Sequence, residues 1–180
     1  MKKVRVPLEN HSYDVLIGEN LISNFPSYLE GVLDRKFLAI VTDRNVENIH
    51  LPRLVTSLTI AGIETKILSI DPGESSKSWK TLQMTVDWML TNKIERNDIV
   101  IALGGGVVGD LVGFAAAILR RGIRFIQCPT SLLAQVDSSV GGKTGINTIH
   151  GKNLVGAFYQ PTKVISDIST LQTIKERDFI

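Results

Sequence analysis

The fold of this 180-residue chain is decided by the stretch Ile99-Val100-Ile101-Ala102-Leu103-Gly104-Gly105-Gly106-Val107-Val108-Gly109-Asp110. The β-branched residues of its first half favour a buried strand, and the Ala- and Leu-rich segment that follows as far as Arg121 favours a helix. The triple glycine is therefore predicted to be the turn between them. Glycine lets a backbone approach a ligand closely, and the first turn of a helix offers unpaired N–H groups with partial positive charge, so a phosphate would bind well here.

The spacing Gly104-x-Gly106-x-x-Gly109 satisfies the dinucleotide fingerprint, which alone is weak evidence for a function. The motif lies in mid-chain, and no Asp or Glu follows about 20 residues later to hold a ribose. If a dinucleotide binds, its ribose must therefore be held from elsewhere in the chain.

A membrane helix is the competing interpretation, because residues 99–119 carry a single charge and contain Gly109-x-x-x-Gly113. Asp110 would then lie near the bilayer centre, and three adjacent glycines would weaken the helix. A strand followed by a helix fits better, so we expect no membrane partner.

Composition favours one soluble globular domain, with 43% hydrophobic and 21% charged residues. The formal net charge of +2 is scattered along the chain and gives no support to a nucleic-acid partner. Cys128 lies in an apolar run, where a buried structural side chain is expected, and a single cysteine forms no internal disulfide. No apolar signal-peptide region follows the basic start, so we expect a cytoplasmic location.

The rest of the chain alternates predicted strands and helices, which indicates an α/β fold with a parallel sheet covered on both faces. A β-hairpin is predicted first, because apolar and polar residues alternate over 4–8 and over 13–17. Strands are expected at 37–41, 65–70, 99–103, 123–128 and 163–168. Helices are expected at 19–32 (interrupted at Pro26), 46–61 (broken near Pro52), 78–90 (capped by Ser75, Ser76 or Ser78), from the triple glycine to 121, and at 175–180.

In parallel sheets, ligands bind at the carboxyl ends of the strands, so the loops that follow the strands are informative. These loops are residues 42–45, 72–77, 104–110 and the pair Thr130-Ser131. Together they offer carboxylates for ribose hydroxyls, a lysine, a phosphate-sized glycine turn and two hydroxyls. Asp, Asn, Ser and Thr are also ordinary helix caps, but four such loops on one edge favour a nucleotide site.

Two lysines follow this region. A helix beyond Leu132 is predicted to end at Gly141-Gly142, which leaves Lys143 on an irregular loop, and Lys152 is expected on a second loop that contains glycine. They are either surface charges or, beside an anion site, groups that neutralise a phosphate or carboxylate. We favour the second interpretation.

Four motifs resemble the 3-dehydroquinate synthase family: residues 104–110, Arg121-Gly122, 135–144 and 151–161. The resemblance covers the chain from the hairpin to Arg177, and it implies a Rossmann-like NAD-binding domain over 1–180. Members of that family use NAD and a divalent metal, zinc or cobalt, to convert 3-deoxy-arabino-heptulosonate 7-phosphate into 3-dehydroquinate and phosphate in the shikimate pathway. Departures within the motifs are small, such as Ser131 in place of a commoner Thr.

Carried over residue by residue, the resemblance implies a cofactor site and a substrate site. The adenosine side of NAD would be held by Asp43, Asn45, Pro72, Gly73, Glu74, Ser75, Ser76 and Lys77. The diphosphate would be held by Gly104, Gly105, Gly106, Val107, Val108, Gly109 and Asp110, with Thr130, Ser131, Thr170, Leu171, Gln172 and Thr173 nearby. Asp137, Lys143, Lys152 and Asn153 would meet the nicotinamide or the substrate, and Arg121 would reach a substrate phosphate across a homodimer interface.

The resemblance also implies a helical second domain, absent from this chain, that supplies a Glu and two His to the metal. The only histidines here, His11, His50 and His150, match no local metal motif. We therefore expect no catalytic zinc and no synthase turnover from this chain alone. A related sugar-phosphate cyclase and a non-catalytic nucleotide-binding or assembly module are the alternatives.

Overall fold

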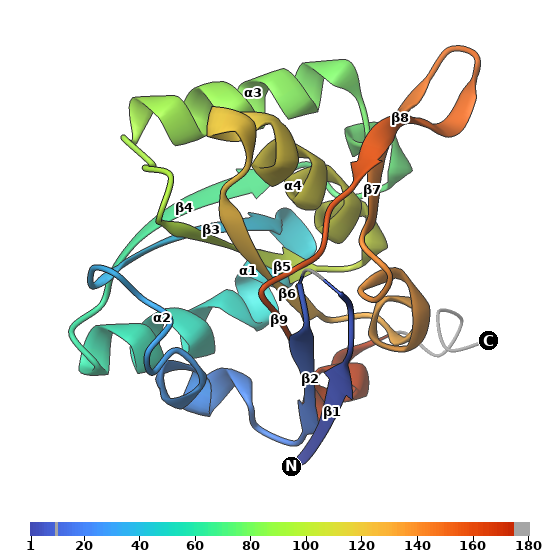
Figure 1. The fold of residues 1–180 in the computed structure, drawn as a ribbon. Helices are drawn as coiled ribbons and strands as arrows, with labels where there is room; N and C mark the ends of the chain where they lie inside the picture. The colour runs from blue at the N-terminus through green and yellow to red at the C-terminus, as the bar shows by residue number, and fades with distance from the viewer. Residues whose placement is uncertain (10, 175–180) are drawn as a thin grey trace.

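A seven-stranded sheet forms the centre of the molecule in the computed structural model, which describes residues 1–9 and 11–174 (Figure 1). Its strands, in the order in which they lie, are β1 (Lys2–Val6), β2 (Tyr13–Gly18), β9 (Lys163–Asp167), β6 (Arg124–Pro129), β5 (Ile99–Gly104), β3 (Phe37–Asp43) and β4 (Glu64–Ile70). All neighbouring strands are parallel except β1 and β2, which form an antiparallel hairpin. The predicted α/β class, parallel sheet and hairpin are confirmed.

Helices cover both faces of this sheet, as the alternation of the sequence predicts (Figure 1). On one face, α3 (Trp79–Thr91) and α4 (Gly106–Ile118) bury Met89 and Phe114 in a core cluster. On the other face, α2 (Leu51–Ile60) and the 3₁₀ helix η1 (Ile22–Tyr28) bury Leu58 and Phe25, with the short α1 (Arg44–Ile49) beside them. Cys128 is fully buried in this second core, where burial raises the pKa of its thiol.

Residues 99–119, considered above as a membrane helix, form the strand β5 and the helix α4 instead. β5 is completely buried, and α4 has 13 residues whose apolar side chains pack into the core. Within residues 1–9 and 11–174, no helix is long and apolar enough to cross a membrane. The apolar character of this stretch therefore reflects burial inside the protein.

Two local predictions are wrong. The helix expected over residues 19–32 is the shorter 3₁₀ helix η1, which contains Pro26 and a non-helical Asn24. Lys143 and Lys152 lie on strands instead of irregular loops, because β7 (Lys143–Thr148) and β8 (Gly151–Phe158) form a separate antiparallel hairpin. The helical turns predicted for 175–180 lie outside the described residues.

Glycines make this second hairpin possible, although glycine in a sequence argues against a strand. A Cβ on Gly145 would lie 2.6 Å from the carbonyl oxygen of Val155, and a Cβ on Gly156 would overlap the carbonyl oxygen of Thr144. The two strands therefore approach too closely for any side chain at these positions. The hairpin projects from the body of the domain beside α4 (Figure 1).

Basic residues occupy the outer strand of the sheet at the β1 edge. The short β1 carries Lys2, Lys3 and Arg5, and its residues are exposed apart from a partly buried Val6. Lys3 and Arg5 pair with Asp14 on β2, at 2.8 and 3.0 Å between nitrogen and oxygen. This edge of the sheet is therefore charged along its length.

Candidate ligand site at the carboxyl edge of the sheet

The glycine turn lies at the carboxyl edge of the sheet, between β5 and α4. Gly105 is the N-cap of α4, and no side chain caps this helix end. A Cβ on Gly105 would lie 3.3 Å from Ser131 Oγ, and a Cβ on Gly106 would lie 3.0 Å from Ser138 Oγ. Two hydroxyls thus stand beside backbone N–H groups of a first helical turn, which have no partner within the helix. Such a surface suits the oxygens of a phosphate or diphosphate.

Lys77 joins three parts of the site. It follows η2 (Glu74–Ser76), and its ammonium donates to Asp110 Oδ2 at 2.6 Å and to Asn153 Oδ1 at 2.5 Å. The Lys77 side chain is only 5% exposed and that of Asp110 is 18% exposed. Burial raises the pKa of the Asp110 carboxyl, and the ammonium beside it opposes that rise. Lys77 therefore connects the loop after β4 with α4 and with β8.

The second hairpin carries the partners that hold this arrangement. Asn153 adopts a positive φ of 57° at a bulge in β8, and its N–H donates to Asn147 Oδ1 at 2.9 Å. The Asn147 side chain donates to Glu74 Oε1 at 2.7 Å, and its backbone N–H donates to the Lys77 carbonyl at 2.8 Å. A bulge redirects a side chain relative to a regular strand, and here it brings Asn153 to Lys77. Asn147 was not predicted as a site residue, because it carries no motif signal.

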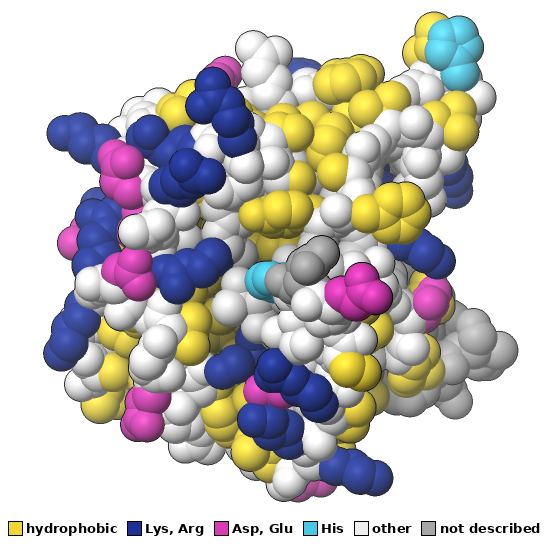
Figure 2. All heavy atoms as spheres, viewed as in Figure 1, with side chains coloured by type: hydrophobic (Ala, Val, Ile, Leu, Met, Phe, Trp, Pro, Cys, Tyr) yellow, Lys and Arg dark blue, Asp and Glu magenta, His cyan; other side chains and the backbone are white. Residues whose placement is uncertain are grey.

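A cavity of about 470 Å³ lies beside this network. Its lining contains Asp110, Asp137, Lys143 and Asn153, four of the residues assigned above to the cofactor or substrate, together with Ser138. Its apolar side includes Leu154 and Phe158, whose residues are 62% and 84% exposed. Figure 2 shows hydrophobic side chains gathered on the face around the second hairpin. The cavity thus combines an ammonium, carboxylates and an apolar rim.

Two predicted substrate residues do not line this cavity. Lys152 is exposed on β8 and lies outside the lining. Arg121 is exposed and closes η3 (Leu119–Arg121), after the end of α4 and just before β6 begins. Because α4 starts at the carboxyl edge and returns the chain to the amino edge, Arg121 lies at the opposite edge of the sheet from the glycine turn. It cannot reach the cavity of its own chain.

Several polar residues after the strands act as caps within the protein, the alternative considered for them above. Asp43 Oδ1 accepts from the backbone N–H groups of Asn45 and Val46, at 2.9 and 3.1 Å, and so caps α1. Ser78, the third of the three proposed caps, begins α3. The buried hydroxyl of Ser76 donates to the Asp71 carbonyl at 2.6 Å. These residues lie at the carboxyl edge of the sheet, as the strand-end rule predicts. Their side chains, however, already make hydrogen bonds within the protein.

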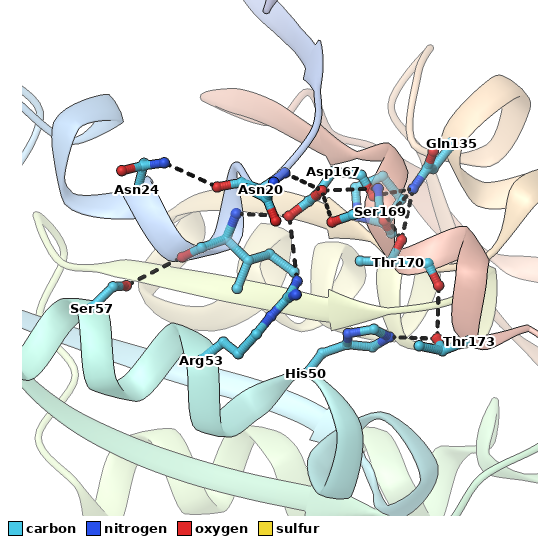
Figure 3. A network of polar contacts seen from close by, with 12 residues as sticks. Asn20, Asn24, His50, Arg53, Ser57, Gln135, Asp167, Ser169, Thr170 and Thr173 are labelled. Carbon is cyan, nitrogen blue, oxygen red and sulfur yellow. Dashed lines mark hydrogen bonds and ion pairs between the residues drawn. The ribbon is translucent and has the colours of Figure 1, made fainter.

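A buried carboxylate, Asp167, organises the end of β9 (Figure 3). The Asp167 side chain is 0% exposed, and it accepts from the backbone N–H groups of Asn20, Ile22 and Ser169, each at 3.0 Å. The guanidinium of Arg53 lies 3.6 Å from Asp167 Oδ2. Asp167 thereby caps η5 (Ile168–Thr173), the turn that contains the predicted cofactor residues 170–173.

Both ends of η5 are tied to other elements. The Thr170 hydroxyl donates to the Asp167 carbonyl at 2.8 Å and accepts from Gln135 Nε2 at 3.0 Å. Thr173 Oγ1 lies 2.9 Å from His50 Nε2, and it donates to the Thr170 carbonyl at 2.7 Å, so His50 is the donor in the first contact. Burial lowers the pKa of His50, with a further contribution from Arg53. Gln135, His50 and Asp167 were not predicted as site residues; among these three, only Asp167 lies at the carboxyl end of a strand, where the strand-end rule could have found it.

The described residues offer no metal centre of their own. Within 1–9 and 11–174, no group of three or more His, Cys, Asp or Glu side chains is placed to hold a metal ion.

The fold and the site together define an α/β domain with a candidate ligand site at the edge where its parallel strands end. Residues 67–180 match the family model described as 3-dehydroquinate synthase N-terminal, and the chain belongs to this family. It is 53% identical over 180 residues to a 3-dehydroquinate synthase from Ruegeria pomeroyi, covering all of this chain and 49% of that protein. The chain thus spans about half the length of the curated relatives it matches.

Two solved structures share the fold. A 2-deoxy-scyllo-inosose synthase complexed with carbaglucose-6-phosphate, NAD⁺ and Co²⁺ superposes with a TM-score of 0.89 at 26% identity, over 98% of this chain and 48% of that one. A 2-epi-5-epi-valiolone synthase from Streptomyces hygroscopicus, with NAD⁺ and Zn²⁺ bound, gives a TM-score of 0.86 at 31% identity, over 96% of this chain and 48% of that one. The expected fold is therefore confirmed by comparison.

Proposed function

We propose that this chain is the NAD-binding half of a 3-dehydroquinate synthase and supplies part of its substrate site. The complete enzyme converts 3-deoxy-arabino-heptulosonate 7-phosphate into 3-dehydroquinate and phosphate. The observation that carries this proposal is the uncapped start of α4, where the hydroxyls of Ser131 and Ser138 stand beside Gly105 and Gly106. The sequence identity of 53–55% to 3-dehydroquinate synthases, over all or nearly all of this chain, supports the choice of reaction.

NAD fits the residues that are present. The glycine turn and residues up to Asp110 would hold its diphosphate, and the loops at 43–45 and 72–77 would hold the adenosine side. The Lys77 ammonium offsets the negative charge of Asp110 near this position, so a diphosphate would not meet an unbalanced carboxylate. When bound, NAD supplies a reversible acceptor for the hydride of a substrate alcohol.

The cavity beside the glycine turn would take the substrate. The exposed ammonium of Lys143 suits a carboxylate or phosphate, and the Asp137 carboxylate can accept a hydrogen bond from a hydroxyl. Lys152 would add positive charge nearby. Arg121 lies at the far edge of the sheet, so its proposed contact with a substrate phosphate would be made in the site of a second copy, within a homodimer.

The metal of the complete enzyme, zinc or cobalt, would be held by the other half of the protein. The apolar rim at Leu154 and Phe158 gives that half a surface to cover. Turnover by a longer chain that carries the metal-binding half, and none by this chain alone, would agree with this division. Turnover by neither would favour the non-catalytic module.

A related sugar-phosphate cyclase is the second candidate, because the two structures above share the fold at TM-scores of 0.86 to 0.89. Sequence identity favours the synthase, at 53% against 26% and 31%. Assays of the longer chain with the heptulosonate phosphate and with a hexose phosphate would separate the two. Release of phosphate from the hexose phosphate alone would favour the cyclase.

The decisive experiment for the cofactor is calorimetric titration of the chain with NAD⁺, repeated with Gly106→Val. A Cβ at position 106 would lie 3.0 Å from Ser138 Oγ, and the valine methyl groups would add further bulk at the helix start. We expect the affinity to fall at least about tenfold, which is a loss of about 1.4 kcal/mol. Thr56→Val, an exposed site on α2, is the matched control and should bind as the parent does. If the Gly106→Val protein binds NAD⁺ as tightly as the parent does, the proposed binding of the diphosphate at this turn is wrong.

A further inference from the structure

One side chain, Gln135, makes contacts at the ends of two neighbouring strands. Gln135 lies in η4 (Ala134–Ser138), and its Nε2 atom lies 3.1 Å from the Pro129 carbonyl, 3.0 Å from the Asp167 carbonyl and 3.0 Å from Thr170 Oγ1. Figure 3 shows this amide directed toward Asp167 and Thr170. Pro129 ends β6 and Asp167 ends β9, and these strands are adjacent in the sheet. A single amide therefore ties η4 to the end of β6, six residues earlier in the chain, and to the distant segment that ends β9 and begins η5.

We propose that Gln135 is a positioning residue for the cofactor and substrate, an inference that rests on the proposed NAD site. The segments it joins are those that the site requires: Thr130-Ser131 follows Pro129, η5 follows Asp167, and η4 carries Asp137 and Ser138. The amide hydrogen bonds of Gln135 go to these segments, and Gln135 is not among the residues that line the cavity, so it acts through the segments and not on the ligand itself.

The chemistry of the contacts calls for a hydrogen-bond donor at this position, which the glutamine amide supplies. Pro129 and Asp167 present carbonyl oxygens, which only accept hydrogen bonds, and the Thr170 hydroxyl already donates to the Asp167 carbonyl. Gln135 must therefore donate to all three, and its two amide hydrogens are shared among them. A carboxylate of the same size would place negative charge against three acceptors and would donate nothing.

Removing the amide should separate the segments without unfolding the sheet. β6 and β9 remain paired through Ile126 with Lys163 and Gln127 with Val164, and η5 keeps its cap from Asp167. Ser131 keeps its contact with the Gln135 backbone N–H, and what is lost is the link that sets where η4, with Asp137 and Ser138, stands relative to the end of β9 and η5. We therefore expect the loss of cofactor affinity to exceed the loss of global stability.

The test measures NAD⁺ affinity by calorimetry for the parent chain, Gln135→Ala and Gln135→Glu, with thermal melting of each. Gln83→Glu, an exposed glutamine on α3, is the matched control. We expect both Gln135 variants to bind about tenfold or more weakly, since buried acceptors lose their donor, while the control is unchanged. The Gln135→Glu protein should regain affinity relative to the parent as the pH falls, because a protonated carboxyl can donate one hydrogen bond.

Asp167, Arg53 and His50 also lie around this network, and their charges can change the affinity of every variant with pH. The ratio of variant to parent affinity at each pH is therefore the quantity to compare. Parent-like affinity in both Gln135 variants, or a ratio that does not change with pH in Gln135→Glu, would overturn the inference while leaving the NAD site in place. Variants that fail to fold would overturn it as well, because Gln135 would then be a determinant of the fold. A parent chain that binds no NAD⁺ would refute the proposed function itself, and this inference with it.

Discussion

Replacing Lys77 by methionine tests whether a buried ion pair holds the site together. Methionine keeps the length and the apolar stem of the side chain but removes the ammonium, so Asp110 loses its partner at 2.6 Å and Asn153 loses its donor at 2.5 Å. Breaking a buried pair by removing one partner costs about 3–5 kcal/mol. Because Asp110 is 18% exposed, we expect the lower end, about 3 kcal/mol. A domain of this size should then melt about 6–12 °C lower.

The assay is thermal and urea unfolding, followed by circular dichroism, of the parent, Lys77→Met and the double variant with Asp110→Asn. The exposed Lys80→Met, on α3, is the matched control and should stay within about 0.5 kcal/mol of the parent. Neutralising Asp110 should recover part of the loss, because no charge is then left without a partner.

The pH dependence of this variant gives an independent check. Without the ammonium, burial holds the pKa of Asp110 above its unfolded value still more strongly. A raised carboxyl pKa means that the folded state binds the proton more tightly, so the variant is most stable, relative to the parent, at acid pH, and loses that stability as the pH rises through the folded pKa. A stability gap below about 1 kcal/mol at neutral pH, or no recovery in the double variant, would refute this account of the pair.

Three further outcomes are expected. Gly156→Ala should lower the stability of the chain by about 1–3 kcal/mol or more, because the new methyl group would overlap the Thr144 carbonyl, whereas the exposed Leu154→Ala should change little; equal melting temperatures would contradict the close strand approach. The pKa of buried His50 lies below its usual value, so the unfolded chain takes up the proton first and the free energy of unfolding should fall as the pH drops below about 6.5. His50→Gln should flatten that part of the urea-midpoint profile, and an unchanged profile would assign the effect to another group. Metal analysis of the purified chain should find no tightly held zinc, and one zinc per chain would refute the assignment of the metal to the other half.

The sequence was sufficient for those features that depend on local pattern. β-branched residues followed by glycines placed the turn between β5 and α4, and the strand-end rule brought the loop at Lys77 to the same edge as the glycine turn. It failed where distant contacts override local preference. The Gly141-Gly142 pair led to an irregular loop being predicted at Lys143, yet β7 begins there, and the close backbone approach of β7 and β8 requires glycine at 145 and 156.

The polar contacts that shape the site were also beyond local inference. Asn153 reaches Lys77 across 76 positions of sequence, and Gln135 reaches Thr170 across 35. Neither contact produces a periodicity or a motif of its own. Their partners are fixed only when the sheet order brings β6 beside β9 and the second hairpin beside α4.

The lysines and arginine along β1 bear on how this protein behaves at high concentration. The edge strand of a sheet has unpaired backbone N–H and C=O groups that can pair with a strand of another molecule. Positive charges on that edge strand repel a second copy and so oppose such pairing. Trimming the first eight residues would instead uncover β2, whose Tyr13, Val15 and Leu16 are almost completely buried. The shortened protein would then present an apolar template on which sheets of neighbouring molecules could grow into aggregates.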